Sequence, residues 1–237
     1  MLSAAAQQKL VSPSPHNGGD ALPLSLDTAT FPYREQFETV TDEVSRIGIM
    51  ADLLARFLRE HGVSTYGWGQ GSSKSFGHLL DELLGNESQF TLINDRLYRV
   101  CRALRIDVRC LVDGRPLQLF EAEQRFSDGR LRIRDSDFAV WEKLKLNEDP
   151  EAGIHRAIRE ELGLDVDNQF LLIPGPTSQV HRPATDFPTL PNIVTSYDFT
   201  VCIPAKLFKR EYVEEQADKT TTFKWRLAPK PIVSIHS

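Results

Sequence analysis

Hydrophobic side chains recur at three- and four-residue spacing in the first third of the chain, which is the spacing of one face of an α-helix. The apolar positions are Phe37, Val40, Val44, Ile47, Met50, Leu53, Leu54 and Leu58. We expect an amphipathic helix from Glu35 to about Glu60, with Gly62 as its C-cap.

A glycine-rich stretch, YGWGQGSSKSFGHLL, follows this helix. It departs from a phosphate-binding P-loop, because Ser73 rather than glycine precedes Lys74 and no buried strand comes before it. The pattern favours a glycine loop and a helix over Phe76–Leu84, with Ser72 or Ser73 as N-cap and Gly85 at its end. Lys74, close to this helix N-terminus, could make a weak phosphate contact.

Beyond residue 90 the pattern changes from helical to β-like, beginning with LYRVCRALRIDVRCLV. Asp113-Gly114 indicates a turn, and Ser127-Asp128-Gly129 indicates a hairpin between PLQLFEAEQRF and LRIRD. The segments FLLIPG, IVTSYDFTVCI and TTTFKWRL are typical of further strands. This order predicts an α+β fold, with a mixed β-sheet, one inserted helix and an N-terminal helical extension.

The inserted helix is predicted within residues 147–164, NEDPEAGIHRAIREELGL. Asp149 suits the N-cap, Pro150 suits the first helical position, and Gly163 ends the helix. Ile154, Ile158 and Leu162 form one apolar stripe, and beside it Ala157, Glu160 and Glu161 share an arc.

Glu161 is unusual, because a carboxylate in the last turn of a helix opposes the helix dipole by a few tenths to about 1 kcal/mol. A divalent metal held by Glu160 and Glu161 would remove this conflict, since hard cations prefer oxygen ligands. The alternative is a solvated acidic helix end, in which Arg156 and Glu160 form an i,i+4 ion pair.

The segment from Val140 to Leu164 resembles the Nudix box without a gap. The matching residues are Glu148, Arg156, Ile158, the paired acids Glu160 and Glu161, Gly163 and Leu164. The resemblance covers roughly residues 100–230 and implies a Nudix-like mixed sheet in an α-β-α sandwich. Two departures stand out: Trp141-Glu142 replaces the usual Gly-Gly pair, and Ala157 replaces a metal-binding Glu.

The resemblance implies a metal-dependent hydrolase of a phosphoanhydride bond in a small nucleoside-linked or other diphosphate metabolite. It implies Mg²⁺ or Mn²⁺ on Glu160 and Glu161, Glu160 as a possible base and Arg156 as its support. Glu148 would either steady the loop-to-helix junction or join an outer metal. The loss of a carboxylate at Ala157 is expected to weaken metal binding.

Two replacements for the missing carboxylate are open. Glu142 could turn toward the helix, or the acidic segment REYVEEQADKT could supply a group from a later loop; the alternative for that segment is a solvated charged surface. Its acids are Glu211, Glu214, Glu215 and Asp218.

Basic residues supply weaker candidates for substrate binding. Arg132 and Arg134, near the predicted hairpin, and Lys143 could contact phosphate, although arginines on a sheet face are commonly solvated. His181 and Arg182, in a predicted proline-containing loop, could form part of a substrate rim or simply cover the sheet.

The composition agrees with a globular chain, since hydrophobic residues make up 41% and charged residues 26%. A net charge of −5 argues against a nucleic-acid polymer as partner, and no apolar run is long enough for a membrane span. Cys101, Cys110 and Cys202 lack metal-site spacing and are typical of reduced thiols.

We expect three segments: a disordered leader over 1–30, a helical extension over 31–98 and a Nudix-like domain over 99–237. The extension could be a regulatory appendage, a dimerisation element or a lid. A homodimer is therefore one of the alternatives for the assembly of this protein. A cytoplasmic location is expected, because the leader lacks the Arg-rich amphipathic pattern of a transit peptide; organelle targeting by the leader is the alternative. The alternatives to a hydrolase are an inactive module that binds a phosphorylated ligand or protein, and a structural interaction protein.

Overall fold

The computed structural model describes residues 42–133, 136–183 and 185–229. The predicted leader over 1–30, the start of the first predicted helix and Arg134 lie outside these residues. Within them, no helix is long and apolar enough to cross a membrane.

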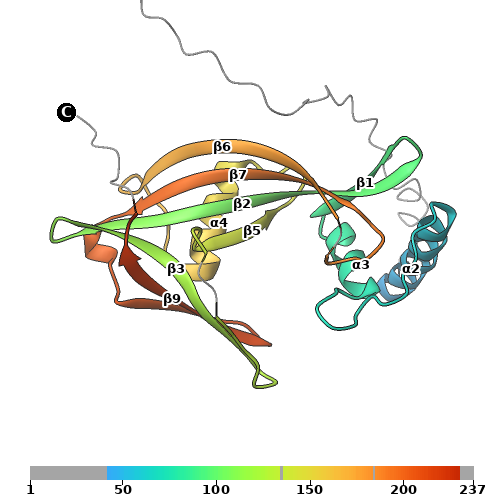
Figure 1. Cartoon of the computed structure of the whole chain (residues 1–237), viewed down its shortest axis with the longest axis horizontal. Coiled ribbons are helices and arrows are strands. Elements are labelled where there is room, and N and C mark those ends of the chain that lie inside the picture. Colours follow the sequence, from blue (N-terminus) through green and yellow to red (C-terminus); the bar gives the residue numbers. More distant parts are fainter. Residues whose placement is uncertain (1–41, 134–135, 184, 230–237) are drawn as a thin grey trace, which may run out of the picture.

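The described chain forms an α+β fold around one mixed sheet, as predicted (Figure 1). The helices are α2 (Glu43–Glu60), α3 (Phe76–Leu84), α4 (Pro150–Leu162) and the short 3₁₀ helix η1 (Ala205–Leu207). The strands are β1 (Ser88–Ile93), β2 (Arg96–Val112), β3 (Arg115–Phe126), β4 (Leu131–Ile133), β5 (Val140–Leu144), β6 (Leu171–Arg182), β7 (Asn192–Ile203), β8 (Glu211–Glu215) and β9 (Lys219–Leu227).

The main path of the sheet has the order β6-β7-β2-β3-β9-β8, and β1, β4 and β5 pair with strands of that path. β2 and β7 run parallel, whereas the other neighbours are antiparallel. The predicted turns are present, since Asp113-Gly114 joins β2 to β3 and Ser127-Asp128-Gly129 joins β3 to β4.

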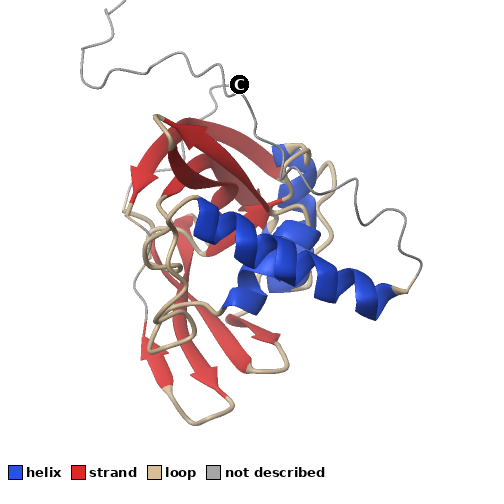
Figure 2. Ribbon diagram, turned by 90° about the vertical axis from the view of Figure 1, so that its right-hand side faces the viewer, coloured by secondary structure: helices blue, strands red, loops and turns tan. Residues whose placement is uncertain are grey.

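The main hydrophobic cluster lies between α4 and the sheet, and α4 contacts β2, β5 and β8. Figure 1 shows α4 behind the middle of the sheet, and α2 and α3 at the end formed by β1. Figure 2 looks onto that end and shows the helices in front of the strands. Among the described residues, α4 is the one helix of more than one turn that packs against the body of the sheet. The described residues therefore do not form the second helical layer of the expected sandwich.

A second hydrophobic cluster joins α2, α3, β1 and the start of β2 to Phe187 and Leu190. β2 takes part in both clusters, through Leu97 in one and Leu104 in the other. The expected domain boundary between residues 98 and 99 therefore falls inside a continuous strand.

A buried ion cluster ties the α3 end to the sheet. The Glu82 carboxylate pairs with Arg99 at 2.5 Å, with Lys74 at 2.8 Å and with Lys143, and it accepts a hydrogen bond from Ser88. Desolvation opposes the charge of Glu82, but Arg99 and the two lysines outweigh it and lower the pKa of Glu82 to about 2. The cluster therefore joins α3 to β1, β2 and β5.

Several local expectations need correction. The N-cap of α3 is Ser75, whose hydroxyl accepts from the His78 amide, while the Ser73 hydroxyl donates within the glycine loop. The C-cap of α2 is His61, and Gly62 follows it with φ +70°.

The segment that contains His181 and Arg182 is not a loop but edge strand β6, which accepts prolines because it pairs on one side and has a register shift between Pro174 and Thr177. The acidic segment that begins at Glu211 is likewise a strand, β8, paired with β9.

Candidate active site

Local sequence signals place α4 as predicted. The Asp149 carboxylate accepts from the amides of Glu151 at 2.9 Å and Ala152 at 3.2 Å, and Gly163 ends the helix with φ +64°. Gly153 allows a close approach to β2 and β5, because a Cβ there would lie 2.2 Å from Cδ2 of Leu144.

Arg156 organises the junction between β5 and α4. Its guanidinium bonds to Glu148 at 2.9 and 3.1 Å, to Glu142 at 2.8 Å, to Glu160 at 3.1 Å and to the Lys143 carbonyl at 2.8 Å. These bonds use all of its N–H donors. The hydrogen bonds with Glu148 raise the pKa of Arg156 and lower the pKa of Glu148. The predicted Arg156–Glu160 pair is therefore present as part of a larger clamp.

The three residues of the predicted carboxylate arc have different surroundings. Ala157 is fully buried in the main hydrophobic cluster, the Glu160 side chain is 55% exposed, and Glu161 is partly buried. Ala157 thus faces the packed interior, since the sheet covers that part of the helix. The arc therefore carries no carboxylate at its middle, and its two acids differ in exposure.

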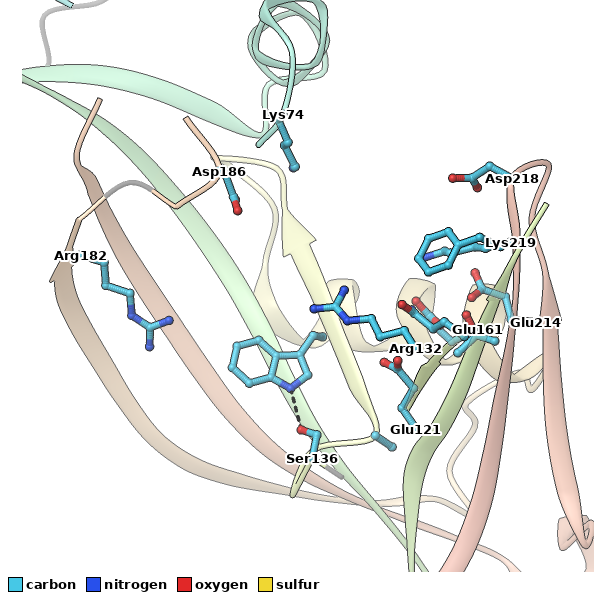
Figure 3. A pocket seen from close by; sticks show the side chains of 15 residues that line it. Lys74, Glu121, Arg132, Ser136, Glu161, Arg182, Asp186, Glu214, Asp218 and Lys219 are labelled. Atoms are coloured by element: carbon cyan, nitrogen blue, oxygen red, sulfur yellow. Dashed lines mark hydrogen bonds between the residues drawn. The ribbon is translucent and has the colours of Figure 1, made fainter. Parts of the chain in front are cut away.

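Glu161 instead faces a carboxylate from another element, Glu214 of β8 (Figure 3). Burial, then the charge and hydrogen bond of Glu214, raise the pKa of Glu161 to about 8, while Lys219 opposes the shift. The Glu161 carboxyl therefore keeps its proton at neutral pH in the absence of a cation. Glu142 adds negative charge nearby, but its own carboxylate is bound to Arg156.

Glu161 and Glu214 line a polar cleft of about 900 Å³, which we call the α4–β8 cleft (Figure 3). Its cations come from four separate segments: Lys74, Arg132, Arg182 and Lys219. Its other lining residues are Glu121, Gln124, Phe126, Ser136, Ala139, Trp141, Asp186, Asp218 and Thr221. A cleft with both paired acids and several cations suits a phosphorylated ligand together with a divalent cation.

The structure divides the predicted substrate-binding residues. Arg132 lies on edge strand β4 and its side chain points into the cleft (Figure 3). Lys143 does not line the cleft, because its ammonium group is held by Glu82 and by Glu87 at 3.4 Å. Arg182 lines the cleft, whereas His181 packs against the Tyr98 ring.

The lining residues that had no assigned ligand role in the sequence include Glu121, Trp141 and Asp186. Trp141 attracted attention only as a departure from the Nudix box. No local pattern links these residues, because they come together only when β3, β5 and the segment after β6 assemble around α4.

The described residues include no cluster of three or more His, Cys, Asp or Glu side chains arranged to hold a metal ion. The residues present still suit a hard divalent cation, since Mg²⁺ commonly uses one or two carboxylates and keeps several waters. A buried hydroxyl oxygen of Thr221, which also lines the cleft, has no hydrogen-bond partner. The donor set therefore consists of Glu161, Glu214 and an oxygen atom whose bonding is incomplete.

No protein-family model and no curated protein matches the chain. Among solved structures, it is similar to the Ap4A hydrolase of C. elegans at 13% identity and a TM-score of 0.32, covering 54% of this chain and 80% of that one. It is similar to the Nudix domain of NrtR from Shewanella oneidensis, in complex with ADP ribose, at 10% identity and a TM-score of 0.30, covering 53% and 71%.

It is also similar to the ORF135 protein of E. coli at 17% identity and a TM-score of 0.24, covering 52% and 72%. Because all three TM-scores lie below 0.5, the functional interpretation rests on the residues of this chain.

Proposed function

We propose that the protein is a metal-dependent hydrolase of a phosphoanhydride bond in a small nucleoside-linked or other diphosphate metabolite. The observation that supports this most is the Glu161–Glu214 pair in a cleft lined by four cations. A protonated carboxyl can release its proton when a divalent cation binds, so the raised pKa of Glu161 is compatible with a metal site.

In this proposal Glu161 and Glu214 hold Mg²⁺ or Mn²⁺, and the bound ion would supply charge neutralisation and a more acidic water. Arg132 and Lys219 bind phosphate oxygens, since both line the same cleft as the paired acids. Lys74 and Arg182 extend the positive lining and bind the more distant part of the ligand.

Glu160 keeps its proposed role as the base that accepts a proton from the attacking water. Its Oε2 accepts a hydrogen bond from Arg156 at 3.1 Å, which orients the carboxylate. Glu148 and Arg156 are positioning residues, because their bonds to one another hold the β5–α4 loop against the helix.

A specific observation favours a second function, the binding of a phosphorylated ligand without turnover. Ala157 is buried, so the carboxylate that the Nudix box has there is absent and its direction is filled by the protein core. Glu148 and Glu160 are also both bonded to Arg156, which is sufficient as a structural role for these three residues.

One experiment separates the two functions. The purified protein is incubated with nucleoside diphosphate derivatives and isoprenoid diphosphates in Mg²⁺ or Mn²⁺, and the release of phosphate or monophosphate is measured. We expect turnover that Glu161→Gln and Glu214→Gln each reduce by at least about 100-fold, because each removes an anionic metal ligand. Glu215→Gln is the matched control, since Glu215 is the exposed neighbour of Glu214 on β8.

Tight binding of a phosphorylated ligand without product release from any compound would contradict the hydrolase and support the binding module. Equal loss of activity in Glu215→Gln would contradict the assignment of Glu214.

A further inference from the structure

Trp141 is held in a defined orientation at the wall of the α4–β8 cleft. It lies on β5, and its indole N–H donates to the Ser136 hydroxyl at 3.3 Å (Figure 3). The Phe138 ring meets the indole edge-on, with ring centroids 6.0 Å apart and an interplanar angle of 89°. These two contacts fix the plane of the ring.

Arg105 backs the indole from the adjacent strand. Its guanidinium carbon lies 5.6 Å from the Trp141 ring centroid, and the two residues are paired across β2 and β5. Arg105 cannot easily move, because it forms a bidentate pair with Asp198 at 2.6 Å for each bond. One side of the indole therefore rests on a rigid, charged support.

The rest of Trp141 opens into the cleft, where the residue is 45% exposed. Most of the other lining residues are polar or charged, and Trp141 and Phe126 are the aromatic residues in the described part of the lining. The Arg130 guanidinium lies over the Phe126 ring, 4.7 Å from its centroid, whereas Trp141 is 45% exposed. A rigid aromatic ring in this setting can stack with a planar ring of a ligand.

We propose that Trp141 is the specificity-determining residue of the cleft and stacks against the planar base of a nucleotide. This inference relies on the proposed function only for the position of the nucleotide phosphates, which would lie toward Arg132 and Glu161. Arg182 and Arg132 line the same cleft as Trp141, so a ligand whose base stacks on Trp141 has cations within the same cleft for its phosphates. Isoprenoid diphosphates lack a planar aromatic ring and gain no comparable stacking.

Fluorescence tests the stacking directly. In the Trp68→Phe/Trp225→Phe variant, Trp141 is the remaining tryptophan. The probes are ADP, GDP, CDP and UDP in the presence of Mg²⁺. Inorganic pyrophosphate, which has no nucleobase, is the control ligand under the same conditions. We expect the nucleotides to quench the emission of Trp141 and pyrophosphate to leave it nearly unchanged.

Calorimetry of the full chain supplies the second measurement. We expect Trp141→Ala to weaken nucleotide binding about tenfold or more and to leave pyrophosphate affinity unchanged, whereas Trp141→Phe retains most of the affinity. Circular dichroism verifies that each variant is folded. The control variant is Trp225→Phe, because Trp225 packs against Phe208 and Tyr212.

The inference is wrong if none of the four nucleotides binds more tightly than pyrophosphate, or if Trp141→Ala binds nucleotides as the parent protein does. Failure of the proposed function gives a different result. Nucleotide binding that depends on Trp141 without any phosphate release would remove the hydrolase and leave the stacking role intact.

Discussion

Glu161 of α4 and Glu214 of β8 face each other as carboxyl groups across the junction of a helix and an edge strand. Lys219 is the cation that most opposes the rise in the pKa of Glu161. This pair, rather than the adjacent Glu160 and Glu161, brings two acids together in the α4–β8 cleft.

The first prediction concerns pH. The pKa of Glu161 is about 8 in the folded chain and 4.5 in its unperturbed state, so the folded state binds the proton more tightly. Stability is therefore unaffected by this group below about pH 4.5 and falls as the pH rises from there to about 8. Glu161→Gln should reduce this fall and raise the free energy of unfolding at pH 8 by about 1–3 kcal/mol.

Denaturant unfolding at pH 5 and pH 8 measures the effect, with Glu215→Gln as the exposed control. Mg²⁺ should stabilise the parent protein more at pH 8 than at pH 5, because metal binding competes with the proton. A parent and a Glu161→Gln variant with the same pH profile would contradict the pairing.

Replacing Arg156 tests the clamp. Arg156→Lys keeps the charge but cannot reach Glu148, Glu142, Glu160 and the Lys143 carbonyl at once. We expect a loss of about 2–3 kcal/mol in the free energy of unfolding, because partly buried acceptors lose their donors. Arg159→Lys is the control on the same helix, since Arg159 pairs with Asp165 at an exposed site and should change stability by less than about 0.5 kcal/mol. Equal effects in the two variants would show that the clamp contributes little.

Restoring the acid of the Nudix box should not restore a metal site. Ala157→Glu places a carboxylate in a fully buried position among Ile154 and Ile158, and we expect a loss of about 3 kcal/mol or more. Ala152→Glu, on the exposed first turn, should be nearly neutral. Thermal unfolding and calorimetry with Mg²⁺ check this; a stable Ala157→Glu protein with higher metal affinity would overturn the placement of Ala157 in the core.

Two glycines give opposite expectations for the same substitution. Gly153→Ala gains helix propensity, but its Cβ would lie 2.2 Å from Leu144 and 3.0 Å from Leu104, both fully buried. We expect overpacking to exceed the propensity gain of about 1 kcal/mol and to lower stability by about 1–2 kcal/mol. Gly48→Ala in α2 meets nothing within 4 Å and should stabilise the chain by up to about 1 kcal/mol. Chemical denaturation of both variants measures the contrast, and a stabilising Gly153→Ala would contradict the close packing of α4.

Much of the secondary structure could be predicted because its signals are local. The caps of α4 depend on Asp149 and Gly163 alone, the hairpin turns depend on two or three adjacent residues, and the Arg156–Glu160 pair follows from helical spacing. β8 was missed as a strand and β6 was predicted only over its first part, FLLIPG, because an edge strand is stabilised mainly by its neighbour and its own pattern is weak.

The amino-acid sequence by itself determined which residues share a helix face, where α4 begins and ends, and which acids were candidates for a metal. Tertiary structure alone decided that Ala157 faces the core, that Lys143 is held by Glu82, and that Glu214 meets Glu161. The physical reason is that helical periodicity specifies the angle between side chains but not the direction in which the sheet covers the helix. That direction follows from packing between elements far apart in the chain, and it determines which side chains line the cleft.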